Sequence, residues 1–198
     1  MRIFLQEFSL SGSPVLDSGT EGKIYDKGKY IIKKITREGR GGKYNSDDEL
    51  ERIYSLHKKL QLLKHPNLCE TFAVKLVKNL KGKISAVEIL KEKLIPLSGY
   101  EKDYLDDFAS LLFNFNVKHD FSLLDDPETY KKINSRVNNI GDDYIKQNLL
   151  GLLDASVFLL KNGIHELFFT NDYGKKIYDF NRNNVMKDEN NTWKIIDF

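Results

Sequence analysis

The sequence predicts an α+β protein: a strand-rich N-terminal lobe that contains one helix, then a helical lobe that ends in short strands. Three observations predict this class. Residues 1 to about 35 alternate short apolar stretches with Gly and Asp turns, which is typical of strands. Leucine and isoleucine recur at steps of three and four between Leu50 and Leu63, which indicates an amphipathic helix. A longer stripe of the same kind runs through residues 144–162. We expect two domains, at residues 1–90 and 91–198.

Within the first domain, residues 22–25 and 30–32 predict two strands joined by a tight turn at Asp26-Lys27-Gly28. A helix is predicted to begin near Ser46 or Asp47, since either residue can cap it, and to end before Pro66. Two more strands are predicted at residues 71–77 and 84–90, with a turn at residues 79–82.

In the second domain, residues 101–126 mix aromatic and acidic positions without a clean period. The helix predicted over residues 144–162 stops at Asn162-Gly163, a favourable C-terminal signal. Residues 167–169 and 177–178 predict a hairpin-like pair of strands. The sequence closes with an apolar stretch at residues 193–198.

Composition narrows the class of partner. The 198 residues are enough to bury a core, and 31 Lys and Arg against 29 Asp and Glu leave a net charge of only +2. So small a charge gives no general reason to expect nucleic acid or an anionic membrane as a partner.

The single Cys69 excludes an internal disulfide and a multi-cysteine zinc site. No apolar run approaches the roughly 18 residues of a membrane span, and the N-terminus resembles no secretory signal. We expect a cytoplasmic protein, or an effector that is delivered into a host cell.

A glycine-containing turn lies between two predicted strands of the first domain. It contains Gly19 and Gly22 and leads into Ile24. Glycines at such a turn let backbone N–H groups approach a phosphate closely, because no Cβ interferes. A plain hairpin turn explains the same glycines, so this feature alone is weak evidence.

A lysine follows on the next predicted strand. Strand alternation places Ile31 and Lys33 on one face and Lys34 on the other. Lys33 could neutralise phosphate charge if an acid held it in place, whereas we expect Lys34 to be solvated. Glu49 is the candidate acid, because it lies in phase with the apolar stripe of the following helix.

The most informative pattern lies near the end of the sequence. Asn184 follows Asp179 by five positions, and Asp197 follows Asn184 by 13 positions, behind two isoleucines. Phosphoryl transfer from ATP needs a carboxylate to orient the acceptor hydroxyl, and oxygen ligands for Mg²⁺, which Asn and Asp supply. Turn chemistry explains Asn and Asp in general, but not these separations beside apolar residues.

Together these features resemble the protein-kinase-like superfamily, including its compact bacterial-effector and phage members and, more distantly, the aminoglycoside phosphotransferases. The resemblance implies a two-lobed fold with a β-rich N-lobe carrying one helix and a truncated helical C-lobe. Gly19-x-x-Gly22-x-Ile24 resembles the later part of the Gly-rich loop, and Ile31-Ile32-Lys33 resembles the strand that carries the ATP-phosphate lysine. His65-Pro66-Asn67 resembles the turn that follows the C-helix.

The same resemblance assigns the remaining roles. Glu49 would be the ion-pair partner of Lys33, and Glu88 and Leu90 would offer backbone groups to adenine. Asp179 would be the catalytic aspartate, with Asn184 and Asp197 as the Mg²⁺ ligands. Three positions near the catalytic aspartate depart from the family pattern: Ile177-Tyr178 replaces its His-Arg, and Asn181 replaces its lysine. Asp197-Phe198 end the sequence before an activation segment, so we expect a minimal kinase-like protein or a fragment.

The expected function is ATP- and Mg²⁺-dependent transfer of the γ-phosphate to a hydroxyl, with a minimal Ser/Thr protein kinase as the first choice and a protein as substrate. One alternative is a pseudokinase-like module that binds a partner protein. Another is a small-molecule kinase of the aminoglycoside type, whose cationic acceptor Asp103, Asp106 and Asp107 could attract.

Overall fold

The computed structural model describes residues 9–19, 22–36, 46–117, 120–164, 168–170, 176–178 and 184–196. The chain forms two compact units. Unit 1 comprises Met1–Lys64 and Glu70–Lys93, and unit 2 comprises His65–Cys69 and Leu94–Phe198. The contacts therefore assign residues 65–69, which the sequence places in the first domain, to unit 2. The α+β class predicted from the sequence is confirmed.

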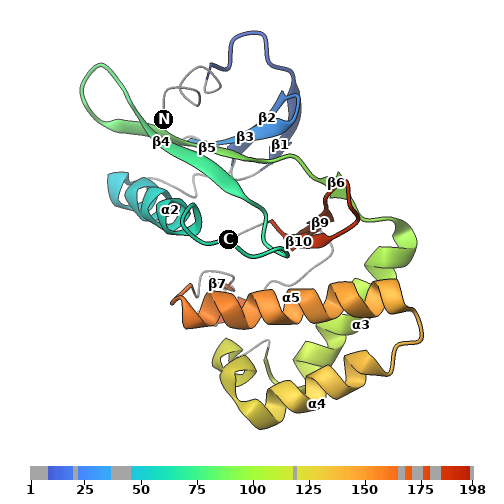
Figure 1. The fold of residues 1–198 in the computed structure, drawn as a ribbon. Coiled ribbons are helices and arrows are strands. Elements are labelled where there is room, and N and C mark those ends of the chain that lie inside the picture. Colours follow the sequence, from blue (N-terminus) through green and yellow to red (C-terminus); the bar gives the residue numbers. More distant parts are fainter. Residues whose placement is uncertain are drawn as a thin grey trace. The chain divides into compact units, whose positions relative to one another are not determined.

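Unit 1 is built on a five-stranded antiparallel sheet (Figure 1). Its strands, in spatial order, are β1 (Val15–Gly19), β2 (Gly22–Lys27), β3 (Tyr30–Thr36), β5 (Ile84–Glu92) and β4 (Thr71–Lys78). The predicted strands at residues 22–25, 30–32, 71–77 and 84–90 all form and are one to four residues longer than expected. β5 lies between β3 and β4, and its six consecutive residues from Ala86 to Lys91 are all buried.

One helix, α2 (Asp47–Leu60), packs against this sheet. Ser46 caps it, as predicted, and Leu50, Ile53 and Leu60 form its buried stripe. Leu50 and Ile53 join a buried cluster with side chains of β3, β4 and β5. The helix ends six residues before Pro66, so the stripe that the sequence extends to Leu63 continues past its end.

The opposite face of the sheet carries a smaller apolar cluster. Ile32 and Leu90 are fully buried there, and Tyr25, Tyr30 and Phe72 pack against them. The sheet of unit 1 is therefore covered by a helix on one face and by its own aromatic side chains on part of the other.

Unit 2 is mainly helical. It contains α3 (Gly99–Asn114), the short 3₁₀ helix η1 (Phe121–Asp125), α4 (Pro127–Asn138) and α5 (Asp143–Lys161). α5 confirms the helix predicted over residues 144–162 and contacts each of the other three. α3 and α4 are not assigned by the sequence pattern, although both begin at clear caps, a capping box at Ser98 and an Asp126-Pro127 start.

Short strands complete unit 2. β6 (Ile95–Pro96), β9 (Val185–Lys187) and β10 (Trp193–Ile195) form an antiparallel sheet in the order β10-β9-β6. β7 (Phe168–Thr170) pairs with β8 (Lys176–Tyr178), which confirms the predicted hairpin. Among the described residues, none of the helices has the length and apolar character that crossing a membrane requires.

Candidate functional site

The predicted glycine turn connects β1 and β2, where Gly19 and Gly22 are register partners. Gly22 has φ +155°, and a Cβ on it would lie 2.1 Å from the carbonyl oxygen of Lys34 in β3. Only glycine fits so close to a neighbouring strand. Packing within the sheet therefore explains Gly22 without any ligand, while the proposed contact of Gly19 and Gly22 with phosphate stays a prediction.

Lys33 lies on the sheet face that α2 covers. Its register partners are Ile24 of β2 and Ile89 of β5, and Ile89 belongs to the buried cluster with Leu50. Ile31 shares this face because strand residues alternate. The structure thus confirms that Ile31 and Lys33 share a face, and it places Ile24 on the same face.

Glu49 has a local structural role. Its carboxylate accepts hydrogen bonds from the backbone N–H of Ser46 at 3.2 Å and from the Ser46 hydroxyl at 3.4 Å. The Ser46 hydroxyl accepts in return from the Glu49 N–H, which completes a capping box. Among the ion pairs recorded between described residues there is none between Glu49 and Lys33. The spacing Ser46-x-x-Glu49 is the sequence signal that should have indicated the cap.

Glu88 and Leu90 do not fit the predicted adenine contact. Both lie inside β5, which has β3 on one side and β4 on the other. Glu88 is opposite Lys34 of β3 and Lys75 of β4, and Leu90 likewise has a register partner in each of these two strands. Their backbone groups are therefore used in the two ladders. The Glu88 carboxylate, only 5 % exposed, pairs with Lys34 at 3.0 Å and lies 3.9 Å from Lys75. The expectation of a solvated Lys34 is wrong, because this buried carboxylate binds its ammonium group.

Sequence reasoning missed Lys91. This residue follows Val87 and Ile89 in the alternation of β5, is opposite Ile31 of β3 and is only 3 % exposed. It therefore shares the face of Lys33. A lysine that continues an apolar run at the period of a strand was the available signal.

The metal-ligand candidate Asn184 lies at the base of the β9–β10 hairpin in unit 2. β9 and β10 pair in register from Val185 with Ile195 to Lys187 with Trp193. One step further, the Ile196 N–H donates to the Asn184 carbonyl at 3.0 Å. Asp197 is the next residue in the sequence, but it lies outside the described residues, as does Asp179. An amide oxygen and a carboxylate are a donor set that suits Mg²⁺.

The segment 65–69 holds the other side of β10. The Ile195 N–H donates to the Asn67 carbonyl, the Cys69 N–H donates to the Ile195 carbonyl, both at 2.9 Å, and Leu68 forms a parallel bridge with Ile195. The Asn67 side chain donates to the Trp193 carbonyl at 2.8 Å. The strand that leads to Asp197 is therefore bonded along both edges.

A partly buried polar network fixes the same hairpin to the helices of unit 2. The Trp193 backbone N–H donates to the Asn148 side chain at 2.8 Å, and the Trp193 indole N–H donates to the Tyr144 hydroxyl at 2.9 Å. Tyr144 donates in turn to Glu101 at 2.5 Å. Lys187 of β9 pairs with both oxygens of Glu101, at 2.9 and 3.0 Å.

The charges in this network shift two pKa values. Burial alone would raise the pKa of Glu101, but hydrogen bonds from Tyr144, Lys187 and the Ser98 N–H outweigh it and lower the pKa to about 2. Burial, with the neighbouring Glu101 carboxylate, raises the pKa of Tyr144 to about 12. At neutral pH the network therefore contains an ionised carboxylate and a neutral phenol.

No protein-family model matches the chain, and no curated protein shows a significant match to its sequence. Within the described ranges, no group of three or more His, Cys, Asp or Glu side chains is placed to hold a metal ion.

Proposed function

We propose that the chain is an ATP- and Mg²⁺-dependent phosphotransferase of the protein-kinase-like type, which transfers the γ-phosphate of ATP to a hydroxyl of a protein substrate. The β9–β10 hairpin carries this proposal. Thirteen residues of extended chain would separate Asn184 from Asp197 by about 40 Å. The hairpin instead brings Asn184 into hydrogen-bond contact with Ile196, the residue before Asp197. A shared Mg²⁺ ion requires such proximity.

The topology of unit 1 gives further support. Unit 1 has an antiparallel sheet of five strands and one helix, α2, which lies between β3 and β4 in the sequence. This arrangement agrees with the β-rich N-lobe that the resemblance implies. The predicted phosphate lysine, Lys33, is in the third strand and on the face that this helix covers. The position of the helix along the chain was part of the resemblance, whereas the spatial order of the strands in the sheet was not used to infer it.

Each proposed residue has a separate task. When bound, ATP with Mg²⁺ supplies the activated phosphoryl group. The Lys33 ammonium binds the α- and β-phosphates, and the buried Lys91 on the same face adds a second positive charge. Asn184 and Asp197 hold the metal through oxygen atoms. Asp179 orients the acceptor hydroxyl and accepts its proton. Glu49 caps α2, and its predicted pairing with Lys33 is not needed for these tasks.

The experiment combines a thermal-shift titration with a transfer assay. We expect Mg-ATP to raise the melting temperature, since a ligand of the native state alone stabilises it. We expect label from [γ-³²P]ATP to enter the protein itself or a protein of a lysate. Lys33→Ala should reduce both signals, and Asp179→Asn should abolish transfer only. The matched controls are Lys29→Ala and Glu189→Gln, which change exposed charges in the turns after β2 and β9. A melting temperature insensitive to Mg-ATP, with labelling unchanged by Asp179→Asn, would refute the proposal.

A protein-binding module without catalysis is the second candidate. The observation that favours it is that Gly22 and Glu49, both predicted for the ATP site, have sufficient structural roles in the sheet and in the cap of α2. Such a module would show no thermal response to Mg-ATP, so the same titration separates the two candidates.

A further inference from the structure

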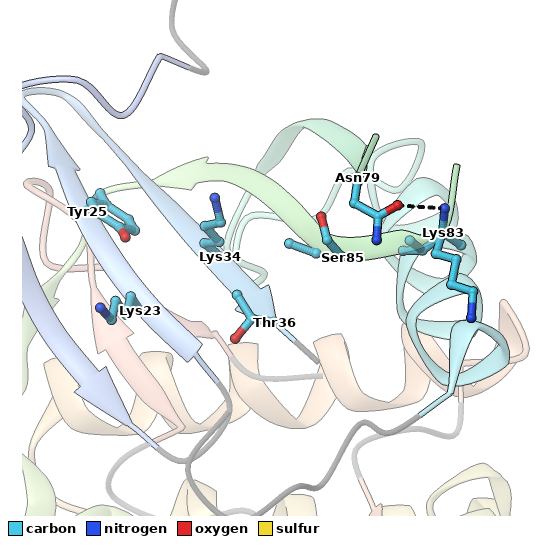
Figure 2. Close-up of a pocket in the computed structure, with 9 residues that line it drawn as sticks. Lys23, Tyr25, Lys34, Thr36, Asn79, Lys83 and Ser85 are labelled. Carbon is cyan, nitrogen blue, oxygen red and sulfur yellow. Dashed lines mark hydrogen bonds between the residues drawn. The ribbon is translucent and has the colours of Figure 1, made fainter. Parts of the chain in front are cut away.

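A pocket of about 570 Å³ lies on unit 1, on the sheet side that carries Lys34 (Figure 2). Lys23 and Tyr25 of β2, Lys34 and Thr36 of β3, and Lys83 and Ser85 of the β4–β5 hairpin contribute to its walls. We propose that this pocket binds a small molecule that carries two or more phosphate groups. The proposal does not depend on the proposed phosphotransferase activity, because Lys33 points to the other face of the sheet.

The positive charge of the pocket is compensated only in part, since Glu88 pairs with just one of its lysines, Lys34. Three lysines line it, and no carboxylate does. Lys23 and Lys34 are direct register partners, and like charges in that relation destabilise a sheet. No ion pair recorded between described residues involves the ammonium group of Lys23 or Lys83. Two positive charges at the walls are thus available to an anion.

Parts of the pocket wall are also held in place, namely the Lys34 side chain and the backbone at Lys83. The buried Glu88 carboxylate, on the neighbouring strand, pairs with the Lys34 ammonium group at 3.0 Å. The turn that leads to Lys83 is fixed by Asn79, whose side chain accepts from the backbone N–H of Lys81 at 2.9 Å. The same side chain accepts from the backbone N–H of Lys83 at 3.1 Å (Figure 2). Preorganised groups lose less conformational entropy when a ligand binds.

Size and chemistry select the class of ligand. A volume of about 570 Å³ is within the range of small-molecule pockets, which favours a compact ligand over a polymer that would lie along a surface. Ammonium groups beside hydroxyls, here those of Tyr25 and Thr36, are the donors that phosphate oxygens accept from. The two available lysines, Lys23 and Lys83, match a ligand with two or more negative charges better than a single carboxylate.

The test uses pyrophosphate without Mg²⁺, titrated calorimetrically into the full chain at 150 mM salt. We expect saturable binding at one site per chain. The double variant Lys23→Gln/Lys83→Gln should weaken it about tenfold or more, the loss expected when a charge-assisted hydrogen bond is removed. The matched control Lys78→Gln/Lys81→Gln removes the same charge from exposed positions of the same hairpin that do not line the pocket, and should change affinity less than twofold.

Three results would overturn the proposal. The first is no saturable binding to the unmodified chain. The second is an equal loss in both double variants, which would indicate diffuse attraction by the net charge. The third is binding that Lys33→Ala abolishes while Lys23→Gln/Lys83→Gln leaves it intact, which would assign pyrophosphate to the ATP site instead. Thermal melts of the double variants confirm that both remain folded, since all four positions are exposed.

Discussion

Glu101→Gln tests whether the buried network of unit 2 stabilises the hairpin that carries Asn184. Glu101 is 4 % exposed and accepts hydrogen bonds from Tyr144, Lys187 and Ser98. Glutamine keeps the size of the side chain and can still serve in the capping box. It removes the negative charge, however, and leaves the half-buried Lys187 without its counter-ion.

The pKa of Glu101 gives the magnitude. The difference between its ordinary pKa of 4.5 and its native pKa of about 2 corresponds to about 3 kcal/mol of stability. Because the native pKa is the lower one, this stabilisation is complete well above pH 4.5 and disappears as the pH falls toward 2. At pH 3, about 2 kcal/mol of it should be lost. The gap in unfolding free energy between the original protein and Glu101→Gln should thus narrow from about 3 kcal/mol at pH 7 to about 1 kcal/mol at pH 3.

The assay is urea unfolding followed by the fluorescence of Trp193, the single tryptophan, whose indole N–H donates to Tyr144 within the same network. Glu128→Gln is the matched control, since its ion pair with Lys132 is exposed and should contribute little at any pH. A gap that is the same at pH 7 and pH 3, or one no larger than that of Glu128→Gln, would show that the ionised carboxylate is not what stabilises the hairpin.

Two glycine substitutions, Gly22→Ala and Gly151→Ala, are expected to destabilise the protein through a steric clash. Gly28→Ala, which creates no clash, is the control. Gly22→Ala forces a Cβ to within 2.1 Å of the Lys34 carbonyl and should destabilise unit 1 by about 3 kcal/mol or more in urea unfolding followed by circular dichroism. Gly28→Ala, at φ +75° with open space around it, should cost only about 1–2 kcal/mol. Gly151→Ala in α5 brings a Cβ within 2.5 Å of the Asn67 side chain and should be destabilising despite the higher helix propensity of alanine. Combined with Asn67→Ala it should cost much less than the sum of both changes, as a double-mutant cycle measures; additive costs would contradict the clash.

The sequence predicted the elements whose signals are local. The cap at Ser46, the stripe of Leu50 and Ile53, and the Asn162-Gly163 stop depend on residues close to one another in the chain, and the helices α2 and α5 form where expected. α3 was not assigned because its hydrophobic positions are interrupted by acidic residues, although its capping box at Ser98 and Glu101 is readable. Alternation also placed Lys33 and Lys34 on opposite faces correctly.

The predicted roles of single residues fared less well, because they depend on partners distant in sequence. Nothing near Lys34 indicates that Glu88, more than 50 residues later, is buried beside it. The same holds for the Trp193 indole, whose partner Tyr144 is 49 residues away. Pairings of this kind are fixed by register and tertiary packing, which a single sequence does not reveal.

The structure therefore divides the predicted site residues by whether packing alone explains them. Gly22 allows the close approach of β3, Glu49 caps α2, and Glu88 pairs with Lys34. Each of these roles lies within unit 1 and requires no ligand. Lys33 stands between Ile24 and Ile89 in register, on the sheet face that α2 covers, and its role toward phosphate stays a prediction. Asn184 is likewise placed at the base of a hairpin that is bonded along both edges, a rigidity that a metal ligand requires and that a surface turn does not. The proposed function is therefore tested first at Lys33 and at the hairpin.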